Sequence, residues 1–272
     1  MTIVCNGEID LYTETRGPDD GPVLVLSTGF DGQLSYWPEE LLKPIIDAGY
    51  RIVLFDTRDA GLSSDGTGYT MDDLAGDLLA VVAAYSKDPV DLLGYSMGGQ
   101  IAMRATLQKP DAVRSLSLIF TTSGADGLSH PPMETNIASL TLAQRQNYEQ
   151  AIEARTKLME LAAGPLAPFD AERAREEAIA THGRSYRPEG IMGHVQALIN
   201  SAPIADRLGE ITKPCLILQA THDCFFVEDH GEDLARRLNC SVEVIDGAGH
   251  DLIGEVASSI AAAFIAFQTR IG

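Results

Sequence analysis

The stretch that decides the fold reads Val90-Asp91-Leu92-Leu93-Gly94-Tyr95-Ser96-Met97-Gly98-Gly99. Its first half is a short, mostly apolar run typical of a buried strand, and a helical pattern begins directly after Ser96. The sequence Gly-x-Ser-x-Gly between a strand and a helix predicts a tight turn with the serine at its apex. Small residues are needed on both sides of the serine because a Cβ would collide with the neighbouring elements. We therefore predict that the Ser96 hydroxyl projects from the carboxyl end of the strand and acts as a nucleophile.

Outward from this turn, apolar runs alternate with helical patterns. The chain opens with an expected antiparallel hairpin around Asn6-Gly7. The predicted buried strands are 23–26, 51–55, 90–93, 116–120, 215–218 and 242–245. The predicted helices are 38–48, 70–86, 97–108, 231–238 and 252–267. This alternation favours an α/β fold in which helices cover both faces of a mostly parallel sheet of about eight strands.

One segment interrupts this alternation. Residues 123–202 contain no convincing strand, but they carry helical patterns near 137–163, 171–180 and 188–200. We interpret the segment as a helical insertion between two strands of the core. Its histidines, His130, His182 and His194, are expected to be surface or packing residues.

Composition excludes several classes of function. The 272 residues include 20 Lys and Arg against 39 Asp and Glu, a formal net charge of −19. Such a chain would be repelled by nucleic acid and by anionic membrane surfaces, and no apolar run is long enough to span a bilayer. We expect neither nucleic acid nor a membrane as a partner. Oligomeric state cannot be read from the sequence.

The cysteines and the first residues point to a cytoplasmic protein. Cys5, Cys215, Cys224 and Cys240 are scattered and form no CxxC pair, so we expect reduced structural thiols and no metal or organic cofactor. The N-terminal residues show neither a basic region nor a long apolar run, and hence no signal peptide is expected.

A serine nucleophile requires a base and a group that orients the base. His250 follows the last predicted strand on a Gly-containing loop, and Asp223 follows the strand before it. The resulting chain order, Ser then Asp then His, is the one expected of this architecture. Asp126 is the rival acid. Cys224 is not expected to be a nucleophile because no strained turn presents it.

Further residues complete the predicted site. The backbone N–H groups of Phe30, after the turn at Gly29, and of Met97, at the start of a helix, are the candidate oxyanion donors. Asp56 and Arg58 could pair to brace the neighbouring loops. The candidate pocket residues, for which core packing is the alternative, are Tyr36, Tyr95, Met97, Phe120, Phe225 and Phe226.

At these motifs the chain resembles the α/β-hydrolase superfamily over nearly its whole length. Segments such as Trp37-Pro38, Asp56-x-Arg58-Asp59-x-Gly61-x-Ser63 and Gly247-Ala248-Gly249-His250-Asp251 are similar to the esterase branch that includes the aclacinomycin methylesterases. The resemblance implies a core of residues 1–122 and 203–272 with an α/β-hydrolase fold, and a helical cap of residues 123–202 over the pocket. The chain departs from the family at Thr28-Gly29, where His-Gly is usual, and at Cys224-Phe225-Phe226, where a Pro-containing segment is usual.

The leading hypothesis is a serine carboxylic-ester hydrolase, a carboxylesterase-type enzyme acting on a neutral, moderately hydrophobic small-molecule ester. Two alternatives stay open. The same residues could hydrolyse a C–C bond or open a lactone, because fold alone does not fix the reaction. The chain could also be a non-catalytic hydrolase-like protein that binds a ligand.

Overall fold

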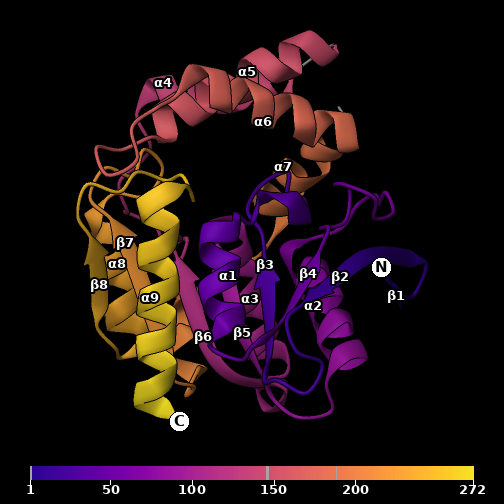
Figure 1. Cartoon of the computed structure of the whole chain (residues 1–272), viewed down its shortest axis with the longest axis vertical. Helices are drawn as coiled ribbons and strands as arrows, with labels where there is room; N and C mark the ends of the chain where they lie inside the picture. Colours follow the sequence, from indigo (N-terminus) through magenta and orange to yellow (C-terminus); the bar gives the residue numbers. More distant parts are fainter. Residues whose placement is uncertain (1, 145–146, 188) are drawn as a thin grey trace.

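The structure, a computed structural model, describes residues 2–144, 147–187 and 189–272. Eight strands form one sheet in the order β1-β2-β4-β3-β5-β6-β7-β8. They are β1 (Thr2–Asn6), β2 (Ile9–Arg16), β3 (Val23–Ser27), β4 (Arg51–Phe55), β5 (Val90–Tyr95), β6 (Val113–Ile119), β7 (Cys215–Ala220) and β8 (Val242–Ile245). Strands β3 to β8 are parallel, and β1 and β2 are antiparallel (Figure 1). The predicted fold class is confirmed. In the N-terminal hairpin, however, Asn6 pairs with Ile9, so the turn residues are Gly7 and Glu8, one position later than predicted.

Helices cover both faces of the sheet, as the alternating sequence pattern predicted. Helices α2 (Met71–Tyr85), α3 (Met97–Gln108) and α8 (Glu228–Leu238) pack on one face, and α1 (Glu39–Asp47) and α9 (Gly254–Ile271) pack on the other. Along β3, Val25 faces the first group, whereas Leu24 and Leu26 face the second. This is the period-two alternation of a strand that is buried on both sides.

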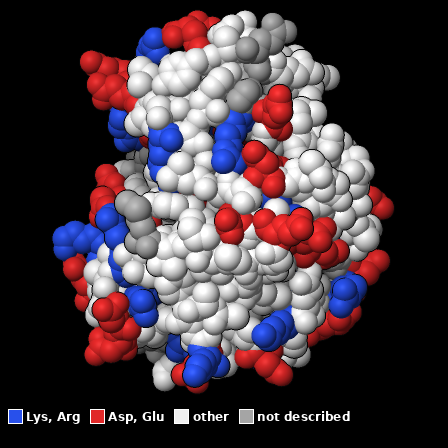
Figure 2. Space-filling model, turned by 90° about the vertical axis from the view of Figure 1, so that its right-hand side faces the viewer, with Lys and Arg blue, Asp and Glu red and all other residues white. Residues whose placement is uncertain are grey.

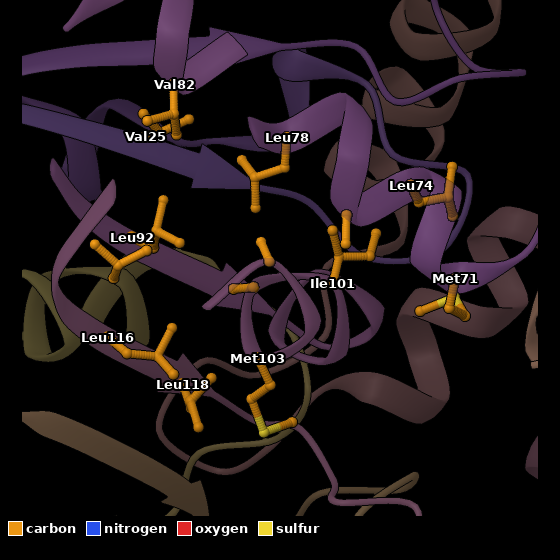
Figure 3. Packing of buried hydrophobic residues seen from close by; sticks show 14 of the residues in the cluster. Val25, Met71, Leu74, Leu78, Val82, Leu92, Ile101, Met103, Leu116 and Leu118 are labelled. Carbon is orange, nitrogen blue, oxygen red and sulfur yellow. The ribbon is translucent and has the colours of Figure 1, made fainter. Parts of the chain in front are cut away.

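The larger core lies between the sheet and helices α2 and α3. Figure 3 shows Leu78 and Val82 of α2, Ile101 of α3, and Val25 and Leu92 of the sheet as members of one buried cluster. All of these side chains are almost fully excluded from solvent. Burial of apolar surface contributes about 25 cal/mol per Å² to stability. This packing therefore anchors α3, the helix that follows Ser96, to the sheet.

Between β6 and β7 the chain forms four described α-helices. They are α4 (Met133–Ala143), α5 (Tyr148–Ala162), α6 (Ala171–Arg184) and α7 (Gly190–Asn200). They lie above the ends of the strands, with α7 nearest to β3 and β4 (Figure 1). The helical pattern expected near 137–163 is divided between α4 and α5, because the Asn147 side chain accepts the Gln150 N–H and starts a new helix. The helix expected from 188 begins at Gly190, and residue 188 itself lies outside the described residues. The division into a core and a cap stays a prediction.

Within the described ranges, none of the helices combines the length and apolarity that crossing a bilayer requires. Figure 2 shows acidic and basic side chains interspersed on one face of the molecule, with acidic groups gathered across its middle.

Candidate active site

Ser96 occupies the turn between β5 and α3 with a backbone φ of 55° and ψ of −124°. A non-glycine residue with these angles is strained, at a cost of order 1–3 kcal/mol, and needs support from its surroundings. The Ser96 N–H donates to the Ile119 carbonyl at 3.0 Å, and the Thr121 hydroxyl donates to the Ser96 carbonyl at 2.6 Å. Both partners lie at the end of β6, so the neighbouring strand holds the turn.

The glycines around Ser96 are required by close contacts. A Cβ at Gly94 would lie 2.4 Å from the Gly98 carbonyl oxygen, and a Cβ at Gly98 would lie 2.0 Å from the Ser27 carbonyl oxygen. Real Cβ atoms do not approach backbone oxygens so closely, because carbon–oxygen contacts below about 3 Å are repulsive. The steric requirement predicted from the motif is therefore present at both positions.

His250 and Asp223 lie beside Ser96, each at the carboxyl end of its strand. The Nε2 atom of His250 is 3.0 Å from Ser96 Oγ, and its Nδ1 atom is 2.8 Å from Asp223 Oδ2. The side chains of Asp223 and His250 are both almost completely buried. The rival acid, Asp126, is exposed on the surface. The structure thus brings the predicted nucleophile, base and acid into one hydrogen-bonded line.

The remaining oxygen of Asp223 is also fixed. Its Oδ1 atom accepts the backbone N–H groups of Phe225 at 2.7 Å and Phe226 at 2.9 Å. These two bonds hold the carboxylate in one orientation, so that Oδ2 faces His250. The Cys224-Phe225-Phe226 segment, which departs from the usual family pattern, therefore supplies the backbone donors that orient the predicted acid, Asp223.

Contacts with the insertion shape the loop that carries His250. A Cβ at Gly249 would lie 2.0 Å from the Ala162 carbonyl oxygen at the end of α5. The Leu166 N–H donates to the Gly247 carbonyl at 2.8 Å. The insertion therefore packs directly against the histidine loop, and glycine permits this close approach.

Aromatic rings surround the His250 imidazole. Ring centroids of Phe225, Tyr95 and Phe226 lie 4.7, 5.1 and 5.6 Å from the imidazole centroid. The Tyr95 hydroxyl donates to the His250 carbonyl at 2.7 Å, and burial raises the pKa of this phenol well above its ordinary value. The ring cluster limits rotation of the imidazole.

The two predicted oxyanion donors come from two separate segments next to Ser96. Met97 is the first residue of α3, where the helix dipole favours negative charge. In the loop after β3, a Cβ at Gly29 would lie 3.0 Å from Ser96 Cβ, which places the Phe30 loop against the serine. Hydrogen bonds to other described residues occupy neither the Phe30 nor the Met97 N–H.

A cavity of about 530 Å³ opens above Ser96. Tyr36, Tyr95, Met97, Phe225 and Phe226 line it, as the sequence indicated. Phe120 does not: it is fully buried beneath the imidazole, with a ring centroid distance of 6.2 Å to His250, and packs in the core. The expectation that Phe120 lines the pocket was wrong because the strand end turns its side chain inward, at a φ of 47°.

The insertion contributes lining that sequence reasoning did not single out. Its apolar members are Leu140, Leu142, Leu158, Met159, Ala162, Val195 and Leu198. Their helical spacing within the insertion was the available signal, but nothing local indicates which face of each helix meets the cavity.

Charged groups also reach this cavity. Arg155 stacks on the Tyr36 ring at 4.1 Å from its centroid and donates a hydrogen bond to the Tyr36 hydroxyl. Asp251 and Glu177 lie in the same wall. Burial raises the pKa of Asp251 to about 6, and the Glu177 carboxylate adds to the shift.

Cys224, which follows Asp223, is not activated as a nucleophile. Burial raises the pKa of its thiol to about 12, so that the thiol is protonated at neutral pH.

The bracing pair expected between Asp56 and Arg58 does not form. Asp56 is fully buried and pairs instead with Arg184 of α6 at 2.8 Å, while Arg58 pairs with Asp77 of α2 at 2.7 Å. Asp56 also accepts the Leu34 N–H at 2.8 Å, beside the oxyanion loop. Each charge found a partner on a distant helix because the two side chains leave the β4 loop in different directions.

Comparison with known proteins defines the class. Residues 22–255 match the family model of the α/β hydrolase fold, and the chain belongs to this family. It is 28% identical to the rhodomycin D methylesterase of Streptomyces peucetius, over 97% of this chain and 96% of that protein. It is 29% identical to a putative carbamate hydrolase of Variovorax paradoxus, over 78% of each chain.

Among solved structures, an esterase from Rhodococcus sp. superposes with a TM-score of 0.82 at 21% identity, covering 99% of this chain and 98% of that one. The enol-lactonase of Burkholderia xenovorans superposes with a TM-score of 0.78 at 20% identity, covering 98% and 100%. The resemblance to the superfamily and its esterase branch is confirmed, and the chain is a hydrolytic enzyme.

Proposed function

We propose that this enzyme is a serine carboxylic-ester hydrolase in which Ser96 is the nucleophile, His250 the base and Asp223 the acid. The observation that carries the proposal is the hydrogen-bonded line of 3.0 Å from Ser96 to His250 and 2.8 Å from His250 to Asp223. It lies at the floor of a cavity, and the relatives named methylesterase and carbamate hydrolase are consistent with acyl transfer.

Under this proposal each group has a role. Ser96 Oγ attacks the acyl carbon while His250 Nε2 takes its proton, and Asp223 holds the proton on Nδ1 and stabilises the imidazolium. The N–H groups of Phe30 and Met97 bind the oxyanion, each with a typical value of roughly 3 kcal/mol. His250 then protonates the leaving alcohol. In the second half of the reaction it activates the water that releases the acid from Ser96.

The cavity favours a neutral, moderately hydrophobic small-molecule ester. Aromatic and aliphatic side chains dominate its wall, and its volume of about 530 Å³ suits a small molecule. Lactone opening and C–C hydrolysis use the same attack on a carbonyl and stay open as alternatives. Substrate preference between them depends on the shape of the insertion, which varies within this fold.

The test is hydrolysis of short p-nitrophenyl esters, with lactone and β-diketone substrates in parallel. Ser96→Ala is expected to abolish turnover and labelling by a fluorophosphonate probe. Ser139→Ala is the matched control, because Ser139 also lies in the cavity wall, but among the described residues its hydroxyl bonds only to the Thr135 carbonyl. Full activity in Ser96→Ala would refute the proposal, and selective turnover of lactones or diketones would transfer the assignment to that substrate class.

A further inference from the structure

His194 of α7 connects the insertion to the loop that carries Phe30. Its side chain is fully buried. Nδ1 accepts the Asp31 N–H at 3.2 Å, and Nε2 is 2.7 Å from the Arg58 carbonyl oxygen. A backbone N–H can only donate and a carbonyl can only accept, so these partners place the imidazole proton on Nε2 and leave Nδ1 as an acceptor. The ring is therefore neutral and held in one tautomer.

The packing of α7 brings this histidine within reach of the core. A Cβ at Gly190 would lie 2.0 Å from the Asp59 carbonyl oxygen, and a Cβ at Gly193 would lie 2.2 Å from Asp59 Oδ2. Positions three and four apart share one helix face, so Gly190, Gly193 and His194 all point at the loop after β4. Figure 1 shows α7 between the other helices of the insertion and the ends of β3 and β4. Two glycines thus allow the backbone of α7 to rest directly on the core.

The loop that receives the histidine is itself under tight constraint. Asp31 has a φ of 60°, and a Cβ at Gly32 would lie 1.8 Å from Thr28 Oγ1. At its far end the Gly32 carbonyl accepts the Thr57 N–H at 3.0 Å. The Phe30 ring meets the imidazole edge-on, at a centroid distance of 5.9 Å. His194 is the contact from the insertion that fixes the peptide next to the Phe30 N–H.

We propose that His194 is a positioning residue for the oxyanion hole, in which the neutral imidazole holds the Asp31 N–H and thereby keeps the adjacent Phe30 N–H aimed at the oxyanion above Ser96. This inference rests on the proposed ester hydrolase function. It makes the docking of α7 a condition for a complete oxyanion hole.

The surroundings of His194 maintain its neutral form. Burial lowers the pKa of its imidazole below the ordinary value, and the Asp31 and Asp59 carboxylates and the Arg58 carbonyl, which face it, oppose this shift only in part. A protonated ring would direct an N–H at the Asp31 N–H and lose the bond.

Two substitutions separate positioning from simple packing. His194→Leu removes both hydrogen bonds, and we expect kcat on p-nitrophenyl esters to fall about 100-fold with KM within about threefold, by analogy with loss of one oxyanion donor. His194→Gln supplies an amide oxygen for the Asp31 N–H and an amide N–H for the Arg58 carbonyl, and we expect it to restore kcat to within about threefold of wild type. Fluorophosphonate labelling of Ser96 should slow in parallel with kcat.

Ile152→Ala is the control for destabilisation, since Ile152 is buried in α5 and does not line the cavity. It should lower Tm and leave the kcat of the folded enzyme unchanged. The inference is overturned if His194→Leu lowers only Tm, or if Ile152→Ala loses as much kcat as His194→Leu. It is equally overturned if ¹⁵N NMR of the wild type finds the proton on Nδ1. Wild-type protein that neither hydrolyses esters nor labels would refute the proposed function, and this inference would fall with it.

Discussion

Replacing Asp223 with Asn changes one atom of the candidate site while preserving its shape. In the structure, Oδ1 of Asp223 is held by two backbone donors, Phe225 at 2.7 Å and Phe226 at 2.9 Å, and Oδ2 faces His250 at 2.8 Å. An asparagine has only one acceptor oxygen, and the two backbone N–H groups require it. Its NH2 group must therefore turn toward His250.

This orientation reverses the tautomer of the histidine. Nδ1 of His250 has to accept the amide N–H, so the imidazole proton moves to Nε2, which is 3.0 Å from Ser96 Oγ. The ring then donates to the serine and cannot take its proton. We expect kcat to fall by about 10⁴, the loss typical of this exchange in a serine triad, which corresponds to about 5.5 kcal/mol in the barrier.

The assay is steady-state hydrolysis of p-nitrophenyl butyrate, with Tm measured on the same preparations. Asp126→Asn is the matched control, because that carboxylate is exposed and should leave kcat at the wild-type value. Asp223→Asn should unfold within a few degrees of wild type, since its hydrogen bonds to the backbone survive. If folded Asp223→Asn kept more than a tenth of wild-type kcat, the tautomer argument would be wrong.

Three further predictions concern stability and charge. Gly98→Ala should lower Tm sharply in a thermal melt because its Cβ would lie 2.0 Å from the Ser27 carbonyl oxygen. Gly76→Ala in α2, whose Cβ would meet the Asn6 side chain at an ordinary contact distance of 3.7 Å, should gain about 0.5–1 kcal/mol, and equal shifts would contradict the steric account. Folded Asp251 keeps its proton up to about pH 6, whereas the unfolded side chain ionises near its ordinary pKa of 3.8, so stability falls with pH across this window. Asp251→Asn should therefore be more stable than wild type by about 3 kcal/mol at pH 7 and equal to it near pH 3 in urea titrations. A gain at both pH values would exclude the titration as its cause. Finally, the net charge of −19 should repel an anionic ester. Because salt screens this repulsion, kcat/KM for an anionic ester should rise with ionic strength. A flat response would show that net charge does not contribute to substrate specificity.

Much of the fold could be predicted because its signals are local. A buried strand is a short apolar run, and the turn at Ser96 needs glycine at fixed offsets, so the sheet and the position of the serine follow from neighbouring residues. Asp223 and His250 were predictable because parallel strands end at the same edge of the sheet. Phe120 shows the limit of this reasoning: it too follows a strand, yet a single backbone angle turns it into the core.

The sequence by itself determined the α/β architecture, the tight turn at Ser96 and the chain order of the three candidate catalytic side chains. Short-range patterns and steric exclusion are enough to specify these features. Tertiary structure alone decided the partners of the charged and buried polar groups. Asp56 pairs with Arg184, 128 positions away, and the Asp31 N–H meets His194, 163 positions away. Such pairs carry no local periodicity. They form only when the packing of the insertion brings desolvated groups together and each must find a hydrogen-bond partner.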